Sequence, residues 1–218
     1  MTNAYTCILF DLDGTIVDSA PGILESLRFV YRELGLAVPE TSELMAWVGP
    51  PILDSFRDLA HLDAEESARA LAIYREHYIV NGVNDATIFD GMPEVLRAVR
   101  DSGIPFSLAT SKPEVPATAI LEHAGLVDLF TVITGASADE VRSAKKDVVA
   151  EALIRLRNLG ADVSRPVLVG DRIHDVEGAM ANNVPTIMVT WGYGTPAERE
   201  GAIAIVNGAP ELLDLLLG

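Results

Sequence analysis

Short apolar runs recur along the chain, each ends abruptly at polar or turn-forming residues, and amphipathic segments separate them. Apolar runs of this length are typical of buried strands, and here they cover 7–10, 105–110, 132–134, 166–170 and 186–190. Helical spacing marks the segments over 94–102, 113–124, 146–159, 175–182 and 210–217. Strands that alternate with helices predict right-handed βαβ units. We therefore expect an α/β fold with a Rossmann-like parallel sheet.

Residues 18–87 break this alternation, because their apolar patterns have helical spacing. One apolar stripe predicts a first helix that Gly35 ends; it comprises Ile23, Leu24, Leu27, Val30, Tyr31 and Leu34. Further helices are expected over 41–47, 51–60 and 63–80, and no strand is expected anywhere in the segment. A helical segment that interrupts a strand-first chain indicates an inserted domain. We predict an α/β core of residues 1–17 and 88–218 and an all-α domain of residues 18–87.

The acidic composition narrows the choice of partners. The 218 residues carry a formal net charge of −16, and 49% of them are hydrophobic. Such a charge disfavours nucleic-acid binding, which needs a basic face. We find no run of roughly 18 apolar residues and no secretory signal, so we expect no membrane span and a cytoplasmic protein. The single cysteine, Cys7, is expected to be a buried small side chain. The oligomeric state stays open between a monomer and a homodimer.

Two carboxylates, Asp11 and Asp13, follow the first predicted strand, and Gly14 comes next. Ligands of open parallel sheets bind at the carboxyl ends of strands, and alternation sends both acids to one side. Carboxylates this close repel each other unless a cation or a proton lies between them. The pair is therefore either a solvated strand end or a Mg²⁺ site with a nucleophilic Asp. An EF-hand is excluded, because its loop needs Gly at the sixth position and here Gly comes fourth.

Hydroxyl and lysine side chains at two later element ends are candidate phosphate ligands. Thr110 and Ser111 end a predicted strand, where they either bind an anion or simply cap the following helix. Lys145 and Lys146 stand at the start of a predicted helix, although helix N-termini favour acids. One of these lysines either stabilises charge on a phosphate or is an ordinary surface residue.

The apolar run over 166–170 ends in Asp171, and Asp175 follows four residues later. Asp171 stands at a strand end, like Asp11 and Asp13, so these three acids can converge on one ion. Mg²⁺ prefers carboxylate oxygens together with water and phosphate. Asp175 either accepts hydrogen bonds from groups around that ion or caps its own helix.

These four stretches resemble, in order, the motifs of the haloacid dehalogenase-like (HAD) phosphatases. The matching segments are Asp-Leu-Asp-Gly-Thr at 11–15, Thr-Ser-Lys at 110–112, Lys-x-Asp-Val at 145–148 and Gly-Asp-x-x-x-Asp at 170–175. The third of them favours Lys145 over Lys146. Trp-Val-Gly-Pro-Pro at 47–51 and Gly-Asp-Arg-x-His-Asp-Val-x-Gly-Ala at 170–179 are similar to the phosphoglycolate phosphatase-like branch.

The resemblance implies a Mg²⁺-dependent hydrolase of small phosphomonoesters with the helical domain as a cap. It implies that Asp11 forms a phosphoaspartate, and that Asp13 serves as acid and then as base. It places Mg²⁺ between the Asp11 and Asp171 side chains and the Asp13 backbone carbonyl, with Asp175 in support. The phosphate ligands that it implies are Thr110, Ser111 and Lys145.

Other functions of the same fold remain open at this point. A phosphosugar mutase would use the same two acids, but related mutases tend to carry Glu where this chain has Gly170. A 5′-nucleotidase would differ only in the leaving group. A non-catalytic binding protein would be expected to lose Asp11, Asp13 or Lys145, and this chain retains all three.

Overall fold

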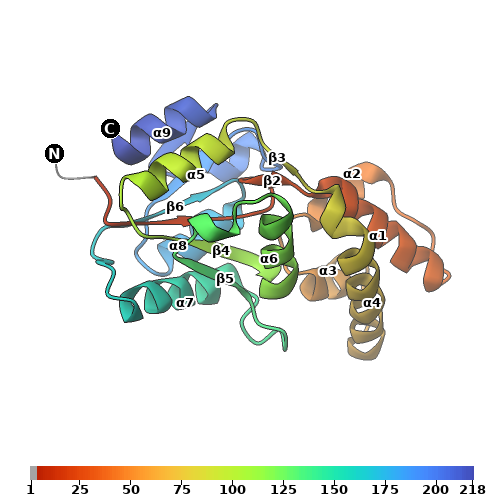
Figure 1. Ribbon diagram of the computed structural model, residues 1–218. Helices are drawn as coiled ribbons and strands as arrows, with labels where there is room; N and C mark the ends of the chain where they lie inside the picture. Colours follow the sequence, from red (N-terminus) through yellow and green to blue (C-terminus); the bar gives the residue numbers. More distant parts are fainter. Residues whose placement is uncertain (1–3) are drawn as a thin grey trace.

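A six-stranded parallel sheet forms the centre of the protein, as a computed structural model describes it for residues 4–218 (Figure 1). The strand order is β5-β4-β1-β6-β7-β8, and every pairing in this sheet is parallel. The strands are β1 (Cys7–Phe10), β4 (Phe106–Pro113), β5 (Val132–Ala136), β6 (Pro166–Gly170), β7 (Thr186–Val189) and β8 (Ala204–Val206). The predicted α/β fold class is confirmed.

Strand β1 lies inside the sheet, between β4 and β6, and the sheet separates two apolar clusters. Phe10 pairs with Leu108 of β4 on one side and with Val169 of β6 on the other. Successive side chains of a strand point to opposite faces. Ile8 and Phe10 accordingly join one apolar cluster, whereas Cys7 and Leu9 join the other. A strand buried on both faces explains why the sequence shows a continuous apolar run here.

Helices cover both faces of this sheet (Figure 1). Residues of α5 and α9 share the cluster of Phe10, and residues of α7 and α8 share the cluster of Leu9. The helices along the sheet are α5 (Met92–Asp101), α6 (Glu114–His123), α7 (Lys145–Asn158), α8 (Ile173–Met180) and α9 (Ala209–Leu217). The starts of α7 and α8 therefore lie next to the carboxyl ends of the central strands.

A second group of helices lies beside the sheet, on the right in Figure 1. It comprises α1 (Ala20–Glu33), α2 (Thr41–Leu44), α3 (Ile52–Asp58) and α4 (Ala64–His77). The predicted helix over 63–80 is shorter than expected, because α4 gives way to a π-helical turn, Tyr78–Gly82. Gly82 packs against α1 so closely that a Cβ there would lie 3.0 Å from the Gly22 carbonyl oxygen and nearer still to the Tyr78 ring.

Two short strands join the helical group to the sheet, and they correct the prediction that 18–87 contains no strand. Strand β2 (Val17–Asp18) pairs antiparallel with β3 (Thr87–Ile88). Each strand has two residues, which are too few to show an alternating apolar pattern in the sequence. The chain therefore enters and leaves the helical group through two paired strands, which we call the β2–β3 ribbon.

Two further departures from the predicted elements concern strands β8 and β4. The sequence pattern does not predict strand β8, because this strand has three residues at the sheet edge and Ile205 is exposed. Strand β4 continues beyond Thr110 as far as Pro113, with a register shift against β5 between Ala109 and Pro113. This irregular extension carries Ser111 and Lys112 toward the helical group. Within residues 4–218, no helix combines the length and the apolar character needed to cross a membrane.

Candidate active site

A tight turn after β1 holds Asp11 and Asp13 in the interior. The amides of Thr15, Ile16 and Val17 all donate to the Leu12 carbonyl, which folds the chain back on itself. Gly14 adopts a φ of +80°, and a Cβ at this position would lie 2.3 Å from an Asp171 carboxylate oxygen. Only glycine satisfies both the backbone conformation and the close approach. Asp11 and Asp13 are 5% and 6% exposed, so they are not a solvated strand end.

The end of β6 brings two more carboxylates to the same place. Asp171 is 1% exposed and follows the last residue of β6, next to the end of β1. Asp175 lies in the first turn of α8, where its Oδ2 accepts hydrogen bonds from the amides of Asp171 and Arg172 at 3.1 and 3.0 Å. Asp175 thus both caps its helix and fixes the loop that carries Asp171.

Lys145 neutralises part of this acidic cluster. Its Nζ lies 2.6 Å from Asp11 Oδ1 and 2.7 Å from Asp175 Oδ1, and it donates to the Ala109 carbonyl at 3.0 Å. Lys145 is 7% exposed at the first position of α7, whereas Lys146 points to solvent. The lysine that resembles the family motif is therefore the one that the fold brings to Asp11.

The remaining charge balance favours a bound cation. Oxygens of Asp11, Asp171 and Asp175 all lie within 4.8 Å of one another, and among the described residues Lys145 is the lysine that pairs with this group. Burial, then the neighbouring Asp175 and Asp13, raise the pKa of Asp11 to about 7, although Lys145 opposes this shift. Burial, followed by Asp175 and Asp11, also raises the pKa of Asp171. These two shifts indicate that Asp11 and Asp171 are costly to ionise together unless a further positive charge lies nearby.

One oxygen of this cluster has the environment that a hard divalent ion requires. Asp171 Oδ1 is fully buried and has no hydrogen-bond partner among residues 4–218, while Asp171 Oδ2 accepts from the Tyr193 amide at 2.7 Å. Buried polar atoms without a partner are rare, because each costs free energy. Carboxylate oxygens are the donors that Mg²⁺ and similar ions prefer. The donor set therefore fits a divalent cation.

The predicted phosphate ligands lie at the neighbouring strand end. Thr110 and Ser111 are 1% and 8% exposed near the end of β4, which is the strand next to β1. Thr110 Oγ1 accepts from the Lys112 amide at 3.2 Å, so the hydroxyl supports the local backbone rather than capping α6. The helix α6 begins later, at Glu114, with no side-chain cap.

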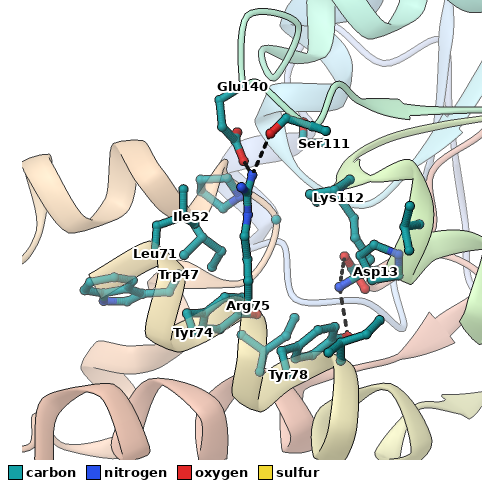
Figure 2. A pocket seen from close by; sticks show the side chains of 18 of the residues that line it. Asp13, Trp47, Ile52, Leu71, Tyr74, Arg75, Tyr78, Ser111, Lys112 and Glu140 are labelled. Carbon is teal, nitrogen blue, oxygen red and sulfur yellow. Dashed lines mark hydrogen bonds and ion pairs between the residues drawn. The ribbon is translucent and has the colours of Figure 1, made fainter. Parts of the chain in front are cut away.

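Sequence reasoning missed Lys112, which contacts Asp13 directly. Its Nζ lies 3.2 Å from Asp13 Oδ2 and donates to the Tyr78 hydroxyl at 2.9 Å (Figure 2). Ser19 donates to the other oxygen, Asp13 Oδ1, at 2.5 Å. The two contacts fix the orientation of the Asp13 carboxyl group. The sequence does place Lys112 directly after Thr110 and Ser111, which could have indicated a role in the site. A helix cap explained that stretch more simply, so Lys112 was not predicted.

Tyr193 is a second residue that the sequence did not single out. Its amide holds Asp171, and its hydroxyl donates to Asp18 Oδ1 at 2.7 Å and accepts from the amides of Ser19 and Ala20. The loop approaches so closely that a Cβ at Gly192 would lie 2.3 Å from Asp171 Oδ2. Tyr193 therefore connects the acidic cluster to the ribbon at the entrance of the helical group. No local pattern signals this contact, because it joins residues far apart in the chain.

The fold and this buried cluster define an α/β protein with a candidate active site at the carboxyl ends of its central strands. A family model described as haloacid dehalogenase-like hydrolase matches residues 8–189. The chain belongs to this family, as its four motifs predicted.

Individual relatives agree with the assignment and differ in their activities. Tyrosine-protein kinase PtkA of Mycobacterium tuberculosis is 42% identical over 86% of this chain, which spans 62% of the length of PtkA. The 5′-nucleotidase of Pseudomonas aeruginosa is 36% identical over 89% of this chain and 86% of its own. The phosphoglycolate phosphatase of Rhodospirillum rubrum is 32% identical over 96% of this chain and 90% of its own.

Among solved structures, a predicted phosphatase from Clostridium acetobutylicum superposes with a TM-score of 0.90 at 37% identity. The match covers 96% of this chain and 97% of that structure. Because the relatives include a kinase, a nucleotidase and phosphatases, family membership alone does not fix the substrate.

Proposed function

We propose that this protein hydrolyses phosphomonoesters with the help of Mg²⁺ and forms a phosphoaspartate on Asp11. The observation that carries the proposal is the placement of Lys145 Nζ 2.6 Å from Asp11 Oδ1, within a buried cluster of carboxylates. A carboxylate held beside a fixed ammonium group can attack phosphorus while the ammonium group attracts the phosphoryl oxygens. The phosphatase relatives and the family model support this proposal.

The side chains of Asp11 and Asp171 and the backbone carbonyl of Asp13 would hold the Mg²⁺ ion, and Asp175 would keep the Asp171 loop in place. When bound, the ion supplies positive charge that offsets the repulsion between Asp11 and a phosphate dianion. Asp171 Oδ1 supports this ligand set, because it is buried and no described residue donates a hydrogen bond to it.

In the first step of the proposed reaction, an Asp11 oxygen attacks phosphorus and the bond from phosphorus to the leaving oxygen breaks. Asp13 gives its proton to that leaving oxygen, which departs as an alcohol. Ser19 and Lys112 contact the two oxygens of Asp13 and so orient its carboxyl group. Thr110, Ser111 and Lys145 are the proposed ligands of the equatorial phosphoryl oxygens.

In the second step, Asp13 takes a proton from water, and the water oxygen attacks phosphorus. The bond between phosphorus and Asp11 breaks, and the Asp11 carboxylate is restored with release of inorganic phosphate. One acid–base group thus serves both steps, as its position between the strand end and the helical group allows.

We further propose that the helical group acts as a cap that excludes bulk water during both steps. Two contacts between the helical group and the sheet side support a closed state. Arg75 of α4 pairs with Glu140, and the Arg172 guanidinium donates to the Val48 carbonyl at 2.5 Å. The β2–β3 ribbon is the proposed hinge, because it joins the two parts.

Packing around Gly170 supports hydrolysis over the mutase alternative. A Cβ at Gly170 would lie 2.3 Å from Asp175 Cγ, so this arrangement leaves no space for a glutamate side chain. Phosphoglycolate and 5′-nucleotide specificity both stay predictions, because the proposed role of the residues around Asp11 is to bind the phosphoryl group, which the two substrates share.

The metal requirement gives the first test. Purified protein is expected to release phosphate from p-nitrophenyl phosphate with Mg²⁺ and to stop when EDTA is added. Asp171→Asn keeps the shape of the side chain but removes its charge, so the Mg²⁺ concentration for half-maximal rate should rise by about tenfold or more. The measurement is initial rate against Mg²⁺ concentration for both proteins.

Asp101→Asn serves as the matched control, because Asp101 is an exposed acid at the end of α5. Its Mg²⁺ requirement should equal that of the wild type. Full activity in metal-free buffer, or an unchanged requirement in Asp171→Asn, would remove Asp171 from the proposed metal site.

A further inference from the structure

A cavity of about 410 Å³ lies between the helical group and the sheet, and Asp13 is part of its wall (Figure 2). Binding sites for small molecules commonly have volumes of roughly 300–1,000 Å³. In the proposed reaction Asp13 protonates the leaving oxygen, so the cavity lies where the leaving group would be. The side chains that line the cavity therefore indicate which kind of leaving group fits.

Apolar and aromatic side chains form most of these walls. The helical group contributes Trp47, Ile52, Leu71, Tyr74, Tyr78 and Ile79. On the sheet side, Pro113 and Val115 add apolar surface beside Ser111 and Lys112. Trp47 is 2% exposed and packs edge-on against Phe56, so this part of the wall is rigid. Such surface favours an apolar or aromatic ligand that displaces water from it.

The cationic groups of the cavity already have partners. Among the described residues that line it, the cations are Lys112 and Arg75. Lys112 Nζ lies 3.2 Å from Asp13 Oδ2 and 4.4 Å from the centre of the Tyr78 ring. Arg75 pairs with Glu140 and also donates to the Ala138 carbonyl at 3.4 Å. A second anionic group on a substrate would have to displace one of these carboxylates, and Glu76 adds a further acid to the lining.

From this lining we infer that the preferred substrate is a phosphomonoester whose leaving group is bulky, uncharged and carries an aromatic ring. The inference rests on the proposed function and specifies its substrate class. A leaving group of two carbons and a carboxylate, as in phosphoglycolate, would leave most of the cavity unfilled and place an unpaired anion against apolar walls. An aromatic leaving group fills the space and needs no free cation.

Primary alkyl phosphates test this inference, because their leaving alcohols have comparable basicity. We expect kcat/KM for 2-phenylethyl phosphate or adenosine 5′-monophosphate to exceed that for phosphoglycolate by at least about tenfold. A higher kcat/KM for 2-phenylethyl phosphate would indicate an arylalkyl leaving group, and a higher value for adenosine 5′-monophosphate would indicate a nucleoside. The inference is overturned when neither exceeds phosphoglycolate by tenfold.

A pair of lysine substitutions tests the role of the wall itself. Ile79 lines the cavity and its neighbour Val80 does not, and both are partly exposed in the same π-helical turn. Ile79→Lys places a cation in the wall, and Val80→Lys adds the same charge outside it. In Ile79→Lys, the ratio of kcat/KM for 2-phenylethyl phosphate to that for phosphoglycolate should fall by about tenfold. Val80→Lys should leave that ratio within twofold.

An equal response of the two lysine variants would overturn the inference, because it would indicate a long-range charge effect rather than a contact in the cavity. Turnover of p-nitrophenyl phosphate separates this failure from that of the proposed function. If that ester is hydrolysed but phosphoglycolate is preferred, only the substrate class is wrong. If no ester releases phosphate, the proposed function fails and the inference fails with it.

Discussion

Asp11→Asn protein is expected to fold normally and to release phosphate at least about 10⁴-fold more slowly than the wild type. The amide is nearly isosteric with the carboxylate, but it is a poor nucleophile and a weaker ligand for a divalent ion. It also loses the negative charge that pairs with Lys145, whose Nζ lies 2.6 Å from Asp11 Oδ1. The measurement is kcat for p-nitrophenyl phosphate at saturating Mg²⁺.

Circular dichroism and thermal unfolding check that the Asp11→Asn protein is folded. The ion pair of Lys145 with Asp175, 2.7 Å in the wild type, is not altered by this substitution itself, so we expect the cluster to retain a neutralising contact. A folded variant that turns over within tenfold of the wild type would show that Asp11 is not the nucleophile.

Lys145→Met has the second largest expected effect. The substitution keeps a long side chain but removes the ammonium group that contacts both Asp11 and Asp175. The loss of a buried charge that stabilises a developing phosphoryl charge should lower kcat by about 10²- to 10³-fold. In EDTA, the free energy of unfolding should also fall by about 3 kcal/mol, because buried carboxylates lose their partner.

Lys146→Met provides the matched control for this prediction. Lys146 is the next residue of α7 and points to solvent, so both its activity and its unfolding free energy should stay near wild-type values. A comparable loss of kcat in the two variants would contradict the assignment of Lys145 to the active site.

The sheet and the acidic cluster could be predicted because their signals are local. A strand buried on both faces has a continuous apolar run, and the turn after it shows as Asp-x-Asp-Gly. Since parallel strands end at one edge, the strand pattern alone is enough to expect that Asp11 and Asp171 meet. Lys145 was distinguished from Lys146 only by resemblance, and the fold gives the physical reason, since the first residue of α7 faces inward.

The contacts that escaped prediction depend on tertiary structure. Lys112 reaches Asp13 because β4 runs past Thr110 with a register shift, and no periodicity encodes that shift. Tyr193 reaches Asp18 across the β2–β3 ribbon, whose strands have two residues each. The apolar cavity likewise arises where two parts of the chain face each other, so sequence spacing does not reveal which residues line it.

The stereochemical course at phosphorus tests the central claim, a covalent intermediate on Asp11, most directly. Transfer to Asp11 and then to water involves two in-line displacements, and each inverts the configuration at phosphorus. A phosphomonoester made chiral with oxygen isotopes and sulfur, hydrolysed in labelled water, should therefore give inorganic thiophosphate with retained configuration. Inverted product would indicate a single direct attack by water and would contradict the proposed mechanism.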